Sequence, residues 1–479
     1  MVFLSPRLAL PLALVALVVG MFAGTDPPNP SLTRVAAVLD SSESAVLWGV
    51  VVADAKTGEV LFERNPLRPL LPASNQKILV AATALDRLGG AFRYRTPLLF
   101  SGVTEAGPDG TTLRGTFAIV GMGDPSFGSS EVDAPDPFAT WAEMLRARGV
   151  TRMEGTLVGD DDRFDDYPYA EGWDMDYLTT QADRYLGVPV SALSYRDNLV
   201  TLKLGPGPTD ATTTPSGAMA VVRRDRFTDR TRGLGVGLRH LPGTGVVEIS
   251  GTVRTREEDL ELPVDDPTRL ALAAFRQALG AAGIDTTALR GEDVDALAER
   301  PDYAGFDTVA VHVSPPLADL VAVMGTRSNN FYAEQIYRTL SPGGDARGSR
   351  LAVRAFLHEQ GDTTGVALYD GSGLSRKNLV TPRAFANTLL RMYRHPEADA
   401  FLRALPYPGQ TGGTLEYRLE GVPVRAKTGT LTHTRALSGY LRTASGRDLV
   451  FVMLANHFTV RESQVVAVMD RLARVLAAG

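Results

Sequence analysis

The chain of 479 residues contains no cysteine. It can therefore form no disulfide and carry no lipid-modified cysteine. Lysine is scarce too, because the only lysines in the sequence are Lys56, Lys77, Lys203, Lys377 and Lys427. The net charge of -6 and the lack of a long basic run leave no electrostatic footprint for nucleic acid, so no nucleic-acid partner is expected.

A hydrolase of the Ser-His-Asp type is not indicated either. The sequence has no Gly-x-Ser-x-Gly elbow, and none of its 6 histidines belongs to a motif that ties it to a serine. The 44% of hydrophobic residues in so long a chain is typical of a globular protein with more than one core. We expect two or three domains.

The N-terminus carries the one conspicuous apolar run. Residues 8–23 are almost all apolar and follow Arg7, which is the layout of an export signal, and the run is short for a membrane span. Because Met21 and Phe22 depart from the usual small-residue cleavage pattern, a retained anchor stays open. We expect residues 1–24 to be a signal peptide or an anchor that contacts the membrane, and the protein to be exported to the periplasm or cell envelope.

Three short motifs indicate the chemistry. In chain order they are Ser74-Asn75-Gln76-Lys77, Ser328-Asn329-Asn330 and Lys427-Thr428-Gly429-Thr430. A serine with a lysine three residues later, combined with a later Lys-Thr-Gly, is typical of acyl transfer in which lysine rather than histidine moves the proton. Each motif alone is weak, but their order in a chain so poor in lysine makes the set specific.

The segment after Ser74 predicts a helix that ends at Gly89 and Gly90. Residues three apart on a helix are neighbours, so the Lys77 amine can reach the Ser74 hydroxyl. Lysine can act as a base only if its pKa is lowered, which burial, a helix N-terminus and a second cation such as Lys427 would favour. The plainer alternative is that Ser74 only caps the helix and Lys77 is solvated.

The other two motifs lie on a loop and on a strand. The serine motif separates two predicted helices, residues 317–324 and 331–340, where a hydroxyl and a carboxamide could relay a proton and hold a substrate amide. The Lys427 motif lies in a β context. Lys427 and Thr428 would hold a terminal carboxylate and Gly429 would allow close backbone approach, while the N–H groups of Thr430 and Ser74 would face an oxyanion.

On these motifs the chain resembles the low-molecular-mass class C penicillin-binding proteins, the D-alanyl-D-alanine carboxypeptidase/endopeptidase family. Family-like strings also occur at residues 121–125, 190–194, 314–317, 370–375 and 437–440. The second motif more commonly reads Ser-Asp-Asn, and Ser328-Asn329-Asn330 keeps its outer two positions.

The resemblance implies an α+β fold with a β-lactamase/transpeptidase-like catalytic domain, in which an antiparallel sheet packs with helices. The interval between Ser74 and Ser328 is long for such a domain, and short β-like runs with Gly and Pro turns fill it. We therefore expect residues 31–99 and 305–479 to form a discontinuous catalytic domain, and residues 100–304 to form a large β-rich insertion of one or two domains.

The resemblance also implies a function. The protein would remove the terminal D-alanine from peptidoglycan stem peptides ending in D-Ala-D-Ala through an acyl-enzyme on Ser74, and β-lactams would acylate the same serine. The implied catalytic residues are Ser74, Lys77, Ser328 and Asn330, with substrate binding by Lys427, Thr428 and Gly429 and no metal or cofactor. The alternatives are a DD-endopeptidase that uses the same site on cross-links, a β-lactamase and a catalytically silent wall-binding module.

An acidic, aromatic segment within the predicted insertion, residues 160–167, precedes Trp173. A similar segment approaches the active site in the family. Asp160 and Phe164 are accordingly the candidates for contact with a cationic amine on a peptide side chain. The alternatives are a solvated acidic loop and a divalent-ion site.

Overall fold

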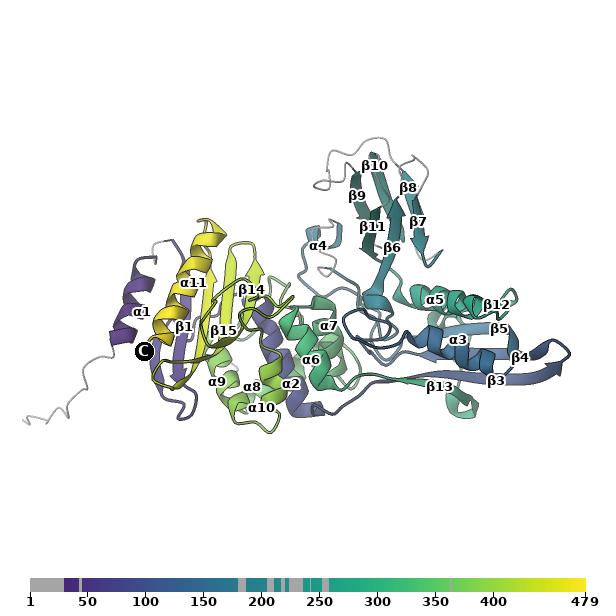
Figure 1. The fold of residues 1–479 in the computed structure, drawn as a ribbon, viewed down its shortest axis with the longest axis horizontal. Coiled ribbons are helices and arrows are strands. Elements are labelled where there is room, and N and C mark those ends of the chain that lie inside the picture. The colour runs from purple at the N-terminus through teal and green to yellow at the C-terminus, as the bar shows by residue number, and fades with distance from the viewer. Residues whose placement is uncertain are drawn as a thin grey trace, which may run out of the picture.

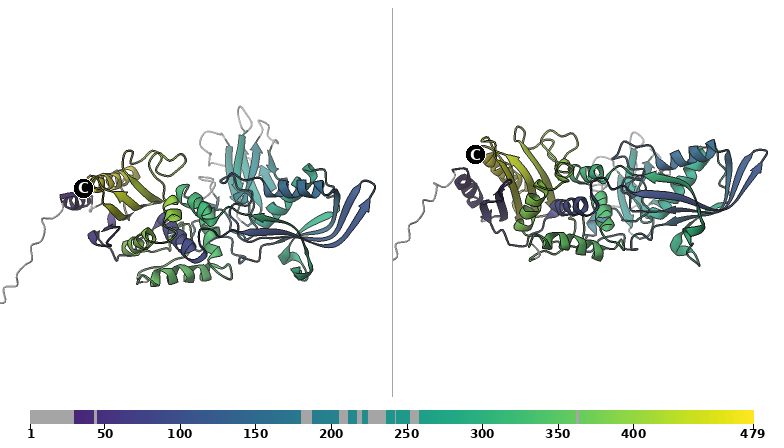
Figure 2. Two further views of the ribbon diagram at one scale, coloured as in Figure 1. Left: turned by 60° about the horizontal axis from the view of Figure 1, so that its bottom comes forward. Right: turned by 90° about the horizontal axis from the view of Figure 1, so that it is seen from below.

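The computed structural model describes residues 30–42, 45–179, 187–204, 211–216, 220–223, 236–241, 243–251, 258–361 and 364–479. The segment predicted as a signal or anchor, residues 1–24, lies outside the described residues. Among those described, no helix has both the length and the apolar character needed to cross a membrane. The molecule is elongated, with two parts placed end to end (Figure 1, Figure 2).

A five-stranded antiparallel sheet organises the first part. Its strand order is β14-β15-β16-β1-β2, so strands from both ends of the chain lie side by side. Seven of the eight residues of β1 are buried, as an apolar run in the sheet interior requires. The bounds are β1 Leu47–Asp54, β2 Val60–Arg64, β14 Val424–Leu431, β15 Thr434–Arg442 and β16 Asp448–Asn456.

Helices cover both faces of this sheet. Two of them, α1 (Pro30–Asp40) and α11 (Glu462–Ala477), pack on one face around Trp48 and Phe451. The remaining helices share the core on the other face, with Tyr332 and Phe385 among its largest buried side chains (Figure 1). They are α2 (Gln76–Leu88), α6 (Leu317–Thr326), α7 (Asn330–Thr339), α8 (Ala346–His358), α9 (Pro382–Tyr393) and α10 (Ala398–Arg403).

The second part is built from the chain between β3 and β13, which pair antiparallel as it leaves and returns. A mixed sheet of order β12-β5-β4-β3-β13 packs against α3 and α5 around Phe138, Trp141 and Phe275. The bounds are β3 Arg95–Gly107, β4 Gly110–Val120, α3 Pro137–Ala147, β5 Val150–Asp160, α5 Pro267–Ala281, β12 Leu289–Asp293 and β13 Asp307–Val313.

Two further sheets, each of three strands, complete this part. One has the order β11-β6-β7 and the other β8-β10-β9. Their strands are β6 Leu199–Leu204, β7 Ala211–Thr214, β8 Ala220–Arg223, β9 Val236–Leu241, β10 Val246–Gly251 and β11 Glu258–Pro263, and a short helix, α4 (Asp176–Thr179), precedes them. An α+β fold with an antiparallel catalytic sheet and a β-rich insertion, as the sequence predicts, is confirmed.

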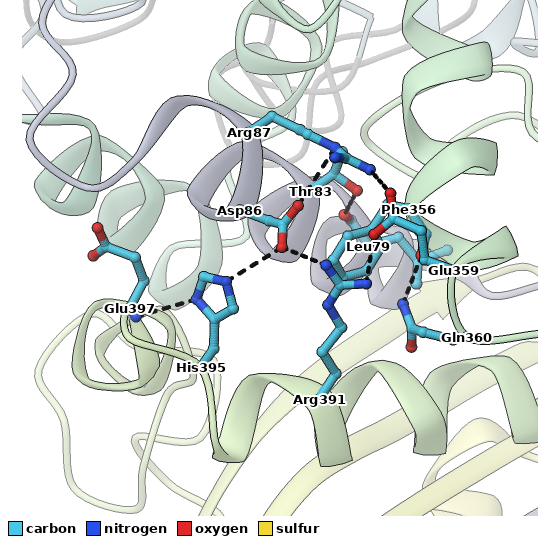
Figure 3. Close-up of polar contacts among 10 residues, drawn as sticks. All are labelled: Leu79, Thr83, Asp86, Arg87, Phe356, Glu359, Gln360, Arg391, His395 and Glu397. Atoms are coloured by element: carbon cyan, nitrogen blue, oxygen red, sulfur yellow. Dashed lines mark hydrogen bonds and ion pairs between the residues drawn. The ribbon is translucent and has the colours of Figure 1, made fainter.

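The C-terminal half of α2 is fixed by polar contacts to α8 and α9 (Figure 3). Asp86 receives hydrogen bonds from Arg391 on α9, and the His395 ring lies 3.2 Å from the same carboxylate. Arg391 also donates to Glu359 at 2.9 Å, and Arg87 forms an ion pair with that glutamate. The helix that carries the first motif is thus held at the end distant from Ser74.

Asn456, at the end of β16, holds the backbone that leads to the first motif. Its Oδ1 accepts from the Leu71 N–H at 2.8 Å and its Nδ2 donates to the Leu71 carbonyl at 3.2 Å. We expect Asn456→Ala to lower the free energy of unfolding by about 1–3 kcal/mol for each backbone group left unpaired. Chemical denaturation measures this, with the exposed Glu420→Ala as control; equal stabilities of the two variants would contradict it.

Candidate active site

Ser74 lies in a tight turn, Ala73–Asn75, directly before α2 begins at Gln76. Ala73 adopts φ +46°, a strained conformation of the kind found at functional turns. Ser74 is half-buried, and neither the turn nor α2 has a side-chain cap. The plain capping role for Ser74 is therefore wrong, and its hydroxyl is engaged elsewhere.

The Ser74 hydroxyl lies against the Lys77 amine. Lys77 Nζ lies 3.1 Å from Ser74 Oγ and donates to Asn330 Oδ1 and to the Ser372 carbonyl, both at 2.7 Å. Only 1% of Lys77 is exposed. Burial lowers the pKa of Lys77 to about 7, against the opposing influence of Asp370 and Glu334.

These contacts suit a neutral amine. The Asn330 and Ser372 acceptors are carbonyl oxygens without a proton, so each must receive an N–H from Lys77. A neutral amine has two N–H bonds and one lone pair, and the lone pair is then left for the Ser74 hydroxyl. The arrangement can withdraw a proton from Ser74 without a histidine.

The second motif supplies a second hydroxyl and the carboxamide. Ser328 adopts φ +58° between α6 and α7, and its Oγ accepts from Lys427 Nζ at 2.9 Å. Asn329 caps α7 by accepting from the Tyr332 N–H at 3.0 Å. Asn330 is the first residue of α7 and faces Lys77, so the three motif positions have three separate tasks.

Lys427 and its neighbours lie on β14, the edge strand next to the Ser74 turn. Lys427 is 1% exposed, and burial, with repulsion from Lys77 second, lowers its pKa well below the usual range. A side chain on Gly429 would come within 3.1 Å of the Pro72 carbonyl, so glycine lets β14 approach the nucleophile turn. Thr428 Oγ1 donates to Thr414 Oγ1 at 2.8 Å.

One cavity of about 570 Å³ joins residues of all three motifs. Ser74, Ser328, Asn330, Thr428, Gly429 and Thr430 line it. A second cavity, of about 660 Å³, lies near the other end of β14, beside Tyr407 and Arg425, and no motif residue lines it. The candidate active site is therefore identified by the motif residues that line the cavity and not by the size of the cavity.

The residues 370–375 contribute a group that the sequence did not predict. The sequence marks them only as a family-like string, yet the Ser372 carbonyl accepts from the Lys77 amine. Gly373 has φ +88°, and a Cβ there would lie 1.9 Å from the Ala73 carbonyl oxygen. Backbone carbonyls leave no sequence signal, although the two glycines of Asp370-Gly371-Ser372-Gly373 are a pattern from which a close backbone approach could have been predicted.

The second part of the molecule reaches the site through Trp173 and Tyr177. Both pack against Ala73 and Leu374, and Trp173 Nε1 donates to Asp370 Oδ2 at 2.9 Å. Tyr177 also lines the cavity that holds Ser74. The segment that follows the acidic stretch, and not the stretch itself, approaches the site.

Asp160 and Phe164 do not line that cavity. Asp160 ends β5, is 6% exposed and accepts from the Asp162 N–H at 3.2 Å. Phe164 is 4% exposed and packs against Val190 and Ala192, under Gly123. Their positions correct the expectation that these two residues contact substrate, because packing within the second part has buried both.

The acidic stretch also bears on the divalent-ion alternative. Asp162, Asp166 and Asp295 place carboxylate oxygens within 4.8 Å of one another. The Arg300 guanidinium forms an ion pair with Asp162 and supplies a positive charge to this cluster. The arrangement matches an acidic surface loop balanced by arginine.

Comparison with known proteins shows the family of the chain. The model of the D-Ala-D-Ala carboxypeptidase 3 (S13) family matches residues 32–478. The chain belongs to this family. It is 29% identical over 444 residues to the D-alanyl-D-alanine carboxypeptidase of Actinomadura sp. (strain R39), covering 87% of this chain and 79% of that protein.

Two solved structures share the fold. The crystal structure of penicillin binding protein 4 (dacB) from Haemophilus influenzae matches with a TM-score of 0.76 at 22% identity, over 93% of this chain and all of that one. Its complex with a novel β-lactam gives a TM-score of 0.71 at 22% identity, over 92% and 98% of the two chains.

Gly373 offers a test of the close packing behind Ser74. In Gly373→Ala the new methyl group must displace the Ala73 carbonyl, so we expect Ser74 to move and its acylation by a labelled penicillin to slow about 100-fold. Gly446→Ala is the matched control, because φ there is +84° and nothing lies within 4 Å of the added Cβ. Equal acylation rates of the two variants, measured by mass spectrometry, would refute the argument.

Proposed function

We propose that this member of the D-Ala-D-Ala carboxypeptidase family is a serine DD-peptidase that releases the terminal D-alanine from stem peptides ending in D-Ala-D-Ala. The observation that carries the proposal is the buried Lys77 amine, 3.1 Å from Ser74 Oγ, with its other two contacts made to carbonyl oxygens. This geometry supports Ser74 as the nucleophile and Lys77 as its general base.

Acylation then follows from the groups around Ser74. Lys77 Nζ takes the hydroxyl proton as Ser74 Oγ bonds to the carbonyl carbon of the penultimate D-alanine, and the backbone N–H groups of Ser74 and Thr430 stabilise the oxyanion. The C–N bond breaks as the proton taken up by Lys77 is relayed through the Ser328 hydroxyl to the leaving amine, so that Lys77 is neutral again and Ser328 keeps its hydroxyl. Asn330 orients the amide on the acyl side. Water hydrolyses the ester and returns the proton to Ser74.

Thr428, which lines the cavity, would contact the terminal carboxylate of the substrate, and Lys427, which is buried beside Ser328 and does not itself line the cavity, would supply the positive charge. A carboxylate beside Lys427 favours its ammonium form, because it supplies the counter-charge that burial otherwise withholds. Repulsion between the two lysine amines then keeps Lys77 neutral. Substrate binding and activation of the base are coupled in this way.

The same site would cleave D-alanyl cross-links as an endopeptidase, and one feature favours that second activity. The cavity wall continues past Thr428 to Thr414, Arg418 and Glu462, which leaves room for a leaving group larger than alanine. β-Lactams would acylate Ser74 in the substrate's pose. Stem peptides and D-alanyl cross-links are both parts of the cell wall, so we infer that the protein acts after export, in the periplasm or cell envelope.

Replacement of Ser74 tests the assignment. We expect Ser74→Ala to abolish labelling by a fluorescent penicillin and the release of D-alanine from a muropeptide ending in two D-alanines. Among the described residues, Ser74 carries the only hydroxyl that contacts Lys77. Mass spectrometry of products from purified wall material also separates terminal cleavage from cross-link cleavage. Full peptidase activity in the variant would disprove the proposal.

The pH dependence of acylation tests Lys77 as the base. Its pKa is lowered to about 7, so the amine is protonated and inactive below that pH. The second-order rate constant for penicillin acylation should fall about tenfold for each pH unit below about 7 and level off above it. Stopped-flow measurement between about pH 5.5 and about pH 8.5 covers this limb. A rate constant that stays flat down to the acid end would exclude Lys77 as the base.

A further inference from the structure

Two buried carboxyl groups lie behind Lys77, and the mechanism above uses neither. Asp370 and Glu334 are 0% and 1% exposed. Asp370 accepts hydrogen bonds from the backbone N–H groups of Gly373 and Ser375 and from the Trp173 and Asn378 side chains, so its acceptor capacity is used by groups other than Lys77. Glu334 is the carboxyl group whose role is unexplained.

Glu334 is bonded to the backbone that holds the base. Its Oε1 accepts from the Gly371 N–H at 3.0 Å and from the Ser372 N–H at 2.7 Å, and Oε2 lies 3.1 Å from the Gly371 nitrogen. Ser372 is the residue whose carbonyl accepts from Lys77. Only the backbone of Ser372 therefore lies between the Glu334 carboxyl group and the carbonyl oxygen that orients the Lys77 amine.

The position of Glu334 on α7 fits this connection. Asn330 and Glu334 are four residues apart and lie on one face of the helix, so α7 contacts Lys77 directly through Asn330 and indirectly through Glu334. Gly371 packs against the same helix, because a Cβ there would lie 2.5 Å from Tyr337 Cβ. The residues 371–373 are thus wedged between α7 and the Ser74 turn.

We propose that Glu334 is a positioning residue for the general base: through the N–H groups of Gly371 and Ser372 it fixes the Ser372 carbonyl, which holds one N–H of Lys77 so that the amine's lone pair faces Ser74. The inference rests on the proposed role of Lys77. It adds a group that touches neither substrate nor nucleophile and that acts through the backbone.

The charge of Glu334 gives the proposal a distinctive signature. Glu334 raises the pKa of Lys77, in opposition to burial, so removal of this carboxyl group lowers that pKa further. Burial and the Asp370 charge raise the pKa of Glu334 itself, while its hydrogen bonds from Ser372 and Gly371 lower it. The other charged or titratable groups around Lys77 and Glu334 are Asp370 on the turn, Lys427 on β14, Tyr337 and Arg338 on α7, and Arg350 on α8.

The test compares Glu334→Gln with Glu397→Gln. Glu397 also accepts a backbone N–H, that of Gly90, but away from the motifs, so both changes replace a carboxyl group with an amide at the same kind of contact. In Glu334→Gln an amide NH₂ replaces one acceptor beside the Gly371 and Ser372 N–H groups. We expect the limiting rate of penicillin acylation to fall about tenfold to 100-fold, and the acid limb to move to lower pH. Glu397→Gln should match the wild type in both.

Glu334→Asp separates geometry from charge. It keeps the charge but is one methylene shorter, so the rate should fall while the acid limb stays at the wild-type pH. Thermal unfolding shows that each variant is folded at the assay temperature, and Glu334→Asp carries the test if the glutamine variant does not fold. An unchanged rate in both variants, or a slower glutamine variant with an unmoved acid limb, overturns the proposal.

A titration that does not depend on acylation keeps the two proposals distinguishable. With ¹³C-labelled lysine, the Lys77 resonance is assigned by comparison with Lys77→Arg, since the chain has few lysines. A lower Lys77 pKa in Glu334→Gln than in Glu397→Gln supports the role of Glu334. An equal pKa in the two variants overturns it. Failure of the wild type to react with penicillin would instead remove the proposed function.

Discussion

The site depends on one buried amine. Lys77 is enclosed among apolar helices and the catalytic sheet, and the removal of water lowers its pKa to about 7. Three oxygens surround its Nζ, and two of them are carbonyls that can only accept. Three elements of the first part contribute to this arrangement: α2 carries the lysine, α7 brings Asn330, and the turn at residues 370–375 brings the Ser372 carbonyl.

The backbone around the amine is packed more tightly than side chains would allow. Gly373 meets the Ala73 carbonyl on one side of the Ser74 turn, and Gly429 on β14 meets the Pro72 carbonyl on the other. Ala73 and Ser328 hold positive φ angles that cost free energy in an isolated chain. The surrounding helices and sheet offset that cost, so the Ser74 and Ser328 hydroxyls are held in place before substrate binds.

The sequence predicts the parts of the site that side-chain spacing encodes. The spacing of Ser74 and Lys77 at a helix start, the two helices around Ser328 and the strand that carries Lys427 all follow from local patterns, and the structure brings the three motifs to one cavity. It does not predict the Ser372 carbonyl or Glu334, because a backbone acceptor and a mid-helix glutamate resemble any others. The sequence also does not predict that Asp160 and Phe164 are buried away from the cavity, because tertiary packing decides whether an acidic, aromatic stretch faces a cleft or a core.

Asp370 is one of the groups that join the second part of the molecule to the turn beside Lys77. Trp173 donates to Asp370, and Asp370 also receives the Gly373 and Ser375 N–H groups of the turn that holds Lys77. Tyr177 lines the cleft, and Trp173 supplies one of the donors that fix the Asp370 side chain. The same turn carries the Ser372 carbonyl that accepts from Lys77, so a displacement of Trp173 would loosen the backbone that orients the amine. A large insertion far along the sequence can in this way influence a proton transfer at residue 77.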